Sequence, residues 1–338
     1  MARIVCFGEA LIDFLARPVS ATDQPRAFLQ HAGGAPANVA VAVARLGGDA
    51  DFVGMLGTDM FGDFLLDSLR GAGVGTRHVR RTGSAHTALA FVSLDARGER
   101  SFSFYRPPAA DLLFRDAHFS EDAFAAARVF HVCSNSLTEA EIAQTTLSGM
   151  RRARAAGALV SFDMNLRPAL WPPGEDPSPR LWSALAAADL VKLSAEELAF
   201  IAAPLSGETA AIARIWHGRA RLLVVTDGAQ PLRWFTPQRS GSMATFDVQA
   251  VDTTAAGDAF AGGLLHGIAA HGVDAASLPV IAAAADALGQ ALRFAAACGA
   301  LAVTRTGAFA AMPRRHDVEA LLRTPPSHPS DARESPAP

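Results

Sequence analysis

Short apolar runs alternate with helical patterns along most of this chain, and that alternation limits the fold more than any other feature. The apolar runs have the length and composition of buried strands, and they lie at residues 4–7, 52–56, 129–132, 159–162, 190–193 and 222–226. Helical patterns fall between them, at residues 36–46, 61–71, 139–155, 180–187 and 210–217. Buried strands that alternate with helices are typical of a mostly parallel sheet with helices on both faces. The sequence therefore predicts an α/β fold with a doubly wound sheet.

Two segments do not fit the alternation. Residues 87–94 and 101–105 have the pattern of a hairpin around residues 95–98, and residues 11–31 also look extended. Strands that do not belong to the main sheet can form a small accessory sheet, which is well placed to act as a lid. We therefore predict one domain over residues 1–323, with a lid built from segments near 11–32 and 87–108.

The last residues and one apolar stretch complete the outline. Residues 324–338 are rich in proline and serine, which predicts a disordered tail. The apolar stretch from Val280 to Leu301 is interrupted by polar residues, so it indicates a buried amphipathic helix and not a membrane span. The formal net charge of −3 gives no general reason to bind nucleic acid or anionic lipid.

Lys192 is the only lysine, because the other basic residues of the chain are arginines. Its context, Val191-Lys192-Leu193, excludes both a phosphate-binding P-loop and the strand lysine of a protein kinase. Any phosphate must therefore be held by backbone amides, by arginine or by a metal.

The three cysteines, Cys6, Cys133 and Cys298, are odd in number and far apart. This spacing argues against a disulfide framework and a zinc site, and it suits a protein of the reducing cytosol. We expect all three to be small buried hydrophobic residues. The N-terminal residues run directly into a strand pattern without a signal peptide, so we predict a cytoplasmic location.

The segment from Asp252 to Gly263 carries the strongest chemical signal. Small residues at Ala255, Ala256 and Gly257 allow a tight turn, and an amphipathic helix begins there. The free amides of its first turn would make an anion site without any lysine. Asp258 in that turn either complements the helix dipole or serves as a general base beside an oxyanion hole. Spacing alone leaves both interpretations open.

This segment resembles the Asp-Thr-Thr-Gly-Ala-Gly-Asp signature of the ribokinase-like (PfkB) carbohydrate kinases, and residues 33–40 resemble the family's N-terminal signature. The resemblance extends from Arg3 to about Leu322. It implies a doubly wound sheet with a small β lid over the sugar. It also implies ATP and Mg²⁺, and Asp258 becomes the catalytic base with an anion hole at Ala255, Ala256 and Gly257. Ala255 replaces a family glycine, which costs about 1 kcal/mol or more if its φ is positive.

The resemblance also assigns the sugar site. The start Gly-Glu-Ala-Leu-Ile-Asp-Phe and the lid segment Tyr-Arg-Pro-Pro-Ala-Ala-Asp are similar to the fructokinase-like branch. The implied sugar-binding residues are Asp13, Gly33, Gly34, Asn38, Arg106, Arg167 and Asp258. Taken without the family, Asp13 is a surface turn residue, and Arg167 a salt-bridge residue near the start of a helix.

The nucleotide and metal residues follow in the same way. Glu197 keeps the acid of the family's Asn-x-x-Glu and would act in the outer shell of magnesium, while Ser194 replaces the asparagine. Asp252 and Thr254 would hold a monovalent cation such as K⁺. The implied nucleotide-binding residues are Lys192, Thr226, Gly228, Gly257, Cys298 and Gly299. Lys192 can equally be a strand-end lysine in solvent, and Pro231 stands where the family has a glycine.

The sequence thus predicts an ATP-dependent kinase that phosphorylates the primary hydroxyl of a small sugar, with D-fructose favoured. A 2-keto-3-deoxygluconate kinase is the first alternative, followed by a ribokinase or nucleoside kinase. A catalytically silent sugar-binding regulator is motivated by the substitutions at Ala255, Ser194 and Pro231. A nicotinamide dehydrogenase lacks its glycine fingerprint. Sugar and ATP are the expected partners, and an exposed lid sheet also allows a homodimer.

Overall fold

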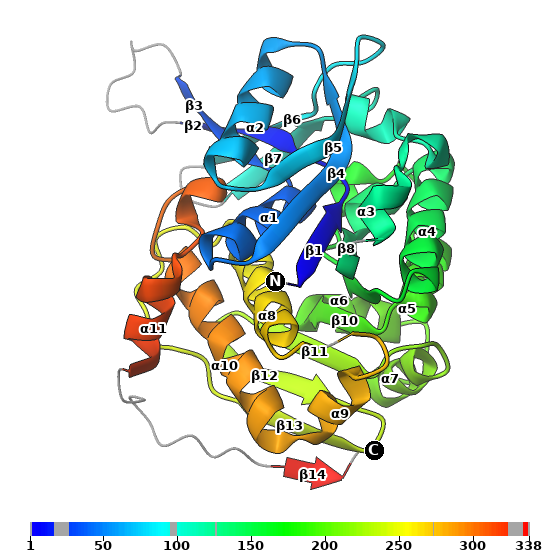
Figure 1. Cartoon of the computed structure of the whole chain (residues 1–338), viewed down its shortest axis with the longest axis vertical. Helices are drawn as coiled ribbons and strands as arrows, with labels where there is room; N and C mark the ends of the chain where they lie inside the picture. The colour runs from blue at the N-terminus through cyan, green and yellow to red at the C-terminus, as the bar shows by residue number, and fades with distance from the viewer. Residues whose placement is uncertain are drawn as a thin grey trace.

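Two sheets of unequal size organise the chain (Figure 1). The computed structural model describes residues 2–16, 27–94, 100–125, 127–272, 274–323 and 334–336. The large sheet has the strand order β14-β13-β12-β11-β10-β9-β8-β1-β4-β5. Its strands are β1 (Arg3–Phe7), β4 (Asp49–Gly57), β5 (Gly75–Thr82), β8 (Ala127–Cys133), β9 (Leu159–Asp163), β10 (Leu190–Ser194), β11 (Leu222–Asp227), β12 (Gln230–Phe235), β13 (Arg239–Met243) and β14 (Glu334–Pro336).

Helices cover both faces of the large sheet, as predicted. Alternate residues of β1 face opposite sides, so that Ile4 and Cys6 join one hydrophobic core and Val5 and Phe7 the other. The α-helices are α1 (Ala35–Arg45), α2 (Met60–Gly71), α3 (Glu121–Ala125), α4 (Ala140–Ala155), α5 (Ser178–Ala187), α6 (Ala195–Ala202), α7 (Glu208–Trp216), α8 (Ala256–Ala270), α9 (Leu278–Ala283), α10 (Ala285–Ala302) and α11 (Arg315–Arg323). Residues from α1, α8 and α10 belong to the first core, and residues from α4 to α7 to the second.

The direction of winding reverses between β1 and β8. From β1 the chain proceeds outward through β4 and β5, and it then returns to β8 and proceeds the other way to β11. All of these neighbouring strands pair in parallel, while β12, β13 and β14 are antiparallel additions. In open α/β sheets, ligands bind beyond the carboxyl ends of the strands at such a reversal. The fold therefore places the expected site next to Gly8, Ser134 and Asp163.

The small sheet confirms the predicted accessory strands. It consists of β3 (Phe28–Gly33), β2 (Leu11–Ala16), β6 (Leu89–Leu94) and β7 (Arg100–Tyr105), in that order. The β6 and β7 strands form the expected antiparallel hairpin, and the turn at 95–98 lies outside the described residues. Because β2 follows β1 after three residues, this sheet is connected directly to the edge where the site is expected.

The structure differs from the sequence predictions in three places. The stretch from Val280 to Leu301 is not one helix, since Ala284 has extended ψ 103° and separates α9 from α10. Strands β5, β12 and β13 were not predicted because they carry polar or charged residues at many positions. The third difference is β14, a strand that was not predicted, which pairs with the open edge of β13. Of residues 324–338 the structure describes only residues 334–336, so the disordered tail stays a prediction.

Two further expectations concern cysteine and the membrane. The three cysteines are free and fully buried, as expected. Within the ranges that the structure describes, no helix combines the length and the apolar character needed to cross a membrane.

Candidate active site

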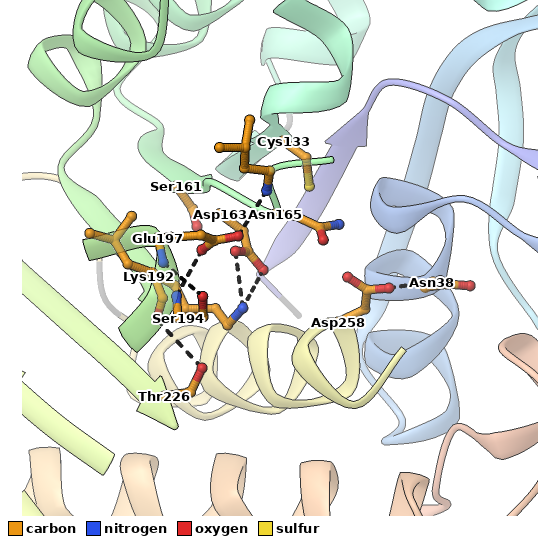
Figure 2. A network of polar contacts seen from close by, with 12 residues as sticks. Asn38, Cys133, Ser161, Asp163, Asn165, Lys192, Ser194, Glu197, Thr226 and Asp258 are labelled. Carbon is orange, nitrogen blue, oxygen red and sulfur yellow. Dashed lines mark hydrogen bonds and ion pairs between the residues drawn. The ribbon is translucent and has the colours of Figure 1, made fainter. Parts of the chain in front are cut away.

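Asp258 lies in the first turn of α8, and its carboxylate is held by a side chain from another helix. The Asn38 amide Nδ2 in α1 donates a hydrogen bond of 2.7 Å to Asp258 Oδ2, as Figure 2 shows. The two helices pack closely because α8 presents Gly262, where a Cβ would come within 2.5 Å of the Ala42 methyl group. Residues 220 positions apart in the sequence thereby meet at one point.

The pKa of Asp258 is raised to about 7. Burial is the largest cause, and the nearby Asp163 carboxylate acts in the same direction. The hydrogen bond from Asn38 and the charges of Lys192 and Arg167 act in the opposite direction. A carboxyl group with a pKa close to neutral can accept and release a proton at physiological pH. This environment would suit a general base, whereas a role in complementing the helix dipole does not require a raised pKa.

The turn before α8 has the strained backbone that was expected if Ala255 had a positive φ. Ala255 is the residue that precedes the helix, and it has φ 58° and ψ 14°, in the left-handed region. The Asp252 carboxylate organises this turn by accepting hydrogen bonds from the Thr254 amide at 2.8 Å and the Gly307 amide at 3.0 Å. The first amides of a helix lack intrahelical acceptors, so those of Gly257 and Asp258 can form a site for an anion, whereas the Ala256 amide donates to the Thr253 carbonyl at 3.4 Å.

Ala255→Gly is expected to stabilise the protein by up to about 1 kcal/mol, because glycine adopts a left-handed backbone without the strain of a Cβ. The anion site should keep its amides, so kcat should change little. Chemical denaturation measures the effect. The matched control is Ala256→Gly, which lies inside the helix and should destabilise by about 0.5–1 kcal/mol. Equal destabilisation by both variants would contradict the strain argument.

Lys192 lies beneath this turn and forms a buried ion pair. Its Nζ lies 3.0 and 2.9 Å from the two carboxylate oxygens of Asp163, on the adjacent strand β9. A Cβ on Gly257 would come within 3.0 Å of the same Nζ. Burial lowers the pKa of Lys192, but the Asp163, Glu197 and Asp258 carboxylates together outweigh burial, so the pKa is raised. Lys192 is therefore not a solvent-exposed lysine, and its ammonium group lies beside the anion site (Figure 2).

Both carboxylate oxygens of Glu197 accept hydrogen bonds from backbone amides. Its Oε2 accepts from the Ser194 amide at 2.7 Å, and its Oε1 accepts from the Leu166 amide at 2.8 Å. The Ser194 hydroxyl in turn accepts from the Glu197 amide, which completes a capping box at the start of α6. Serine at this position thus performs the capping that an asparagine would. Within the described residues no group of three or more acidic, histidine or cysteine side chains could hold a metal ion.

Three of the residues that the resemblance assigns to the sugar, Asp13, Gly33 and Gly34, lie close together. A Cβ on Gly33 would come within 2.1 Å of Asp13 Oδ2, so the Asp13 carboxylate lies directly over this glycine. The pKa of Asp13 is raised to about 7. Burial is the largest cause of this rise, and the negative charge of Asp258 is the second. Gly34 has φ 105° and lies against the Glu9 carbonyl, where a Cβ would clash at 2.6 Å. Asp13, Gly33 and Gly34 therefore belong to the same site as Asp258.

Gly33→Ala is expected to weaken sugar binding selectively, because the new methyl group must displace the Asp13 carboxylate. A hydrogen bond to a charged group contributes about 1.5–3 kcal/mol, so the sugar KM should rise about tenfold or more. The KM for the nucleotide should stay unchanged. Gly71→Ala is the matched control, because a Cβ there meets nothing within 4 Å. An unchanged sugar KM in Gly33→Ala would remove Asp13 from the site.

Arg106 and Arg167 occupy different environments. Arg106 is only 2% exposed, and it pairs with Asp111 and donates to the Thr138 hydroxyl. This buried pair at the end of β7 differs from the predicted reach to a sugar, which stays a prediction. Arg167 is exposed, and its charge lowers the pKa of Asp258. Its role in binding the substrate stays a prediction.

The nucleotide-side residues are only partly placed as predicted. Thr226 and Gly228 lie at the turn between β11 and β12, where Gly228 has φ 54°. Gly299 lies beneath the start of α8, since a Cβ would be 3.3 Å from the Ala256 carbonyl. Cys298 is fully buried, and its Sγ would lie 2.7 Å from a Cβ on Gly263. The Cys298 side chain thus fills the packing between α8 and α10, and its assignment to the nucleotide site stays a prediction.

Three polar residues of this region were not assigned a role from the sequence. They are Glu9, Asn135 and Asp163, and each is at most 5% exposed. Asp163 and Asn135 follow predicted strands at the carboxyl edge of the sheet, which was an available signal. No local pattern pointed to Glu9.

Comparison with known proteins agrees with the geometry. The model of the pfkB family carbohydrate kinases matches residues 1–315. A probable fructokinase-4 of Arabidopsis thaliana is 43% identical over 322 residues, which cover 95% of this chain and 96% of that protein. A crystal structure of fructokinase with bound ATP from Xylella fastidiosa is 59% identical with a TM-score of 0.92, covering 95% of this chain and 98% of that one. A fructokinase double mutant from Vibrio cholerae O395, with fructose, ADP and potassium ion bound, is 33% identical with a TM-score of 0.84, covering 96% of this chain and 99% of that one.

Proposed function

Because this chain belongs to the pfkB family of carbohydrate kinases, we propose that it transfers the γ-phosphoryl group of ATP to the primary hydroxyl of D-fructose, giving fructose 6-phosphate and ADP. The observation that carries the proposal is the buried Asp258 carboxylate, held by Asn38 at the start of α8. It combines a proton acceptor and an anion site within one helical turn, which is what phosphoryl transfer to a hydroxyl requires.

In this mechanism Asp258 accepts the proton of the attacking hydroxyl. The sugar oxygen forms a bond to the γ-phosphorus while the bond from that phosphorus to the bridging oxygen of ADP breaks. Asn38 keeps the Asp258 carboxylate oriented, and Asp13 accepts hydrogen bonds from other hydroxyl groups of the sugar. The lid of β2, β3, β6 and β7 excludes water, which would otherwise compete as the nucleophile.

The negative charge of the transferring group is held by amides and by two cationic side chains. The amides at the start of α8, chiefly those of Gly257 and Asp258, provide donors, and removing one such donor typically costs about 10²- to 10³-fold in kcat. Lys192 lies next to these amides, and Arg167 approaches from the loop after β9. Lys192, Thr226, Gly228, Gly257 and Gly299 line the side that we assign to the nucleotide.

Two cations complete the proposal. Magnesium supplies neutralising charge to the phosphates when it is bound, and Glu197 would contact it through water. Both oxygens of Glu197 already accept backbone amides, which suits an indirect role better than direct coordination. A monovalent cation would lie near Asp252 and Thr254, and related fructokinase structures contain potassium or calcium.

A substrate panel tests this function. Purified protein is incubated with ATP and with fructose, glucose, ribose, 2-keto-3-deoxygluconate or adenosine, and ADP release is measured. We expect fructose to give the highest kcat/KM. Preference for the acid sugar would identify a ketodeoxygluconate kinase, and tight sugar binding without ADP release would identify a silent regulator.

We also propose that the lid forms a homodimer. Phe28 of β3 and Tyr105 of β7 are 38% and 67% exposed, and both rings contact Phe91 of β6 at 5.3 Å between centroids. An exposed aromatic face of this kind favours association with a second copy. Sedimentation should show a dimer, and Tyr105→Glu should shift it toward monomer. A monomer at all concentrations would contradict the proposal.

A further inference from the structure

Glu9 is a buried acid at the point where the chain leaves the large sheet for the lid. It lies between β1 and β2 and is 1% exposed. Its Oε1 accepts a hydrogen bond of 3.1 Å from the Ala35 amide and one of 2.9 Å from the Asn135 side chain. The mechanism above gives this residue no role, yet it connects three separate parts of the site.

The contact with Ala35 holds the start of α1. Gly34 precedes that helix and has no side chain to cap it, so the Glu9 carboxyl provides the acceptor from another element. The same segment supports Gly34 through its backbone, because a Cβ there would be 2.6 Å from the Glu9 carbonyl. One turn into α1 lies Asn38, which orients Asp258. Glu9 therefore fixes the sugar loop and, through α1, the partner of the base.

Burial favours the neutral form of Glu9. The nearest cation, Arg106, already donates from Nε and Nη2 to Asp111 Oδ2, at 2.9 and 2.6 Å. An ionised Glu9 would therefore be a second buried carboxylate beside an arginine that already pairs with Asp111, which is costly. Burial is the largest cause that raises the pKa of Glu9, and the Asp111 charge raises it further. The Arg106 charge and the hydrogen bond from Asn135 lower it.

The hydrogen bonds lead to the same conclusion. Glu9 Oε2 and Asn135 Oδ1 are both buried acceptors with no hydrogen-bond donor among the described residues. Buried polar atoms without partners are rare and destabilising. A proton on Glu9 Oε2 would donate to Asn135 Oδ1 and satisfy both atoms, while Asn135 Nδ2 still donates to Oε1.

We propose that Glu9 is a positioning residue of the sugar site, and that it acts as a neutral acid paired with the Asn135 amide. The inference rests on the proposed function, because its consequence is the affinity for the sugar. The neutral acid caps α1, holds Gly33 and Gly34 against the lid connection, and keeps Asn38 aligned with Asp258.

Two substitutions separate this role from simple stabilisation. Glu9→Gln reproduces the shape and hydrogen bonds of a neutral acid, so the sugar KM, kcat and Tm should stay within about twofold or a few degrees of the wild type. Glu9→Ala removes the cap and the Asn135 contact, so the sugar KM should rise about tenfold, equivalent to about 1.4 kcal/mol. The ATP KM should not change in either variant. Glu141→Gln, on the surface of α4, is the matched control.

Each outcome decides the proposal. If Glu9→Gln raises the sugar KM as much as Glu9→Ala does, the acid is ionised and the proposal fails. If Glu9→Ala lowers Tm but leaves the sugar KM unchanged, the residue is only structural. Should Glu9→Ala not fold, Asn135→Ala provides the second test and should also raise the sugar KM alone. Calorimetric binding of fructose without ATP keeps the test independent of catalysis, so that absence of phosphorylation in the wild type would count against the proposed function only.

Discussion

Asp258→Asn is expected to lower kcat by about 10²- to 10⁴-fold, the range that a general base contributes. Asparagine retains an oxygen that can accept the bond from Asn38, so the local structure and fructose affinity should stay nearly intact. The measurement is steady-state phosphorylation together with calorimetric binding of the sugar. The control is Asp286→Asn, which also removes an acid from a first helical turn, that of α10, but on the surface. If both variants keep normal turnover, Asp258 serves only the helix dipole.

The pH dependence gives an independent measure of the same residue. The base must be ionised to accept a proton, so kcat/KM should rise with pH and level off above the pKa of about 7. The free energy of unfolding depends on pH in the opposite direction, because a carboxyl whose pKa is raised on folding stabilises the folded state in its protonated form. The stability that Asp258 contributes is fully present below about pH 4, where an ordinary aspartate is protonated, and it is lost as the pH rises through about 7. At pH 8, Asp258→Asn should therefore unfold at a higher temperature than the wild type.

The fold could be predicted from the sequence where burial leaves a simple pattern. The six predicted strands of the parallel sheet are all present, because strands covered on both faces must be apolar throughout. Strands β5, β12 and β13 were not predicted for the converse reason, since they carry polar or charged residues and are only partly buried. The interruption at Ala284 has no signal in a run of alanines, where each residue is a good helix former.

The site could be predicted where one short segment contains all the chemistry. Residues 252–258 predicted a tight turn at the start of a helix, and the structure has that turn, with Ala255 in the left-handed conformation. The anion site and the base stay predictions. The role of Glu9 could not be predicted, because its partners Ala35 and Asn135 lie 26 and 126 residues away. The buried environment of Lys192 could not be predicted from the sequence either. A strand-end lysine looks the same in sequence whether it faces solvent or a carboxylate on the next strand.

Lys192→Met is expected to destabilise the protein by roughly 3–5 kcal/mol, because it leaves the Asp163 carboxylate buried without its partner. The Asp163 side chain is 1% exposed and that of Lys192 8%, so water cannot replace the lost ion pair. Denaturation measures this loss. Adding Asp163→Asn removes the unpaired charge, and the double variant should recover most of the stability. Failure of the double variant to recover would mean that packing, and not charge, is what Lys192 supplies.

The double variant also isolates the catalytic contribution of the only lysine. Because its stability is restored, any remaining loss reflects the missing positive charge beside Gly257, 3.0 Å from a Cβ placed there. We expect the ATP KM to rise and kcat to fall while the fructose KM stays constant, since Asp13 and Gly33 do not contact Lys192. Arg167 and the amides of α8 would then be insufficient to hold the phosphates alone. An unchanged ATP KM and kcat would mean the reverse: this kinase binds its nucleotide without lysine, and Lys192 is retained for the Asp163 pair.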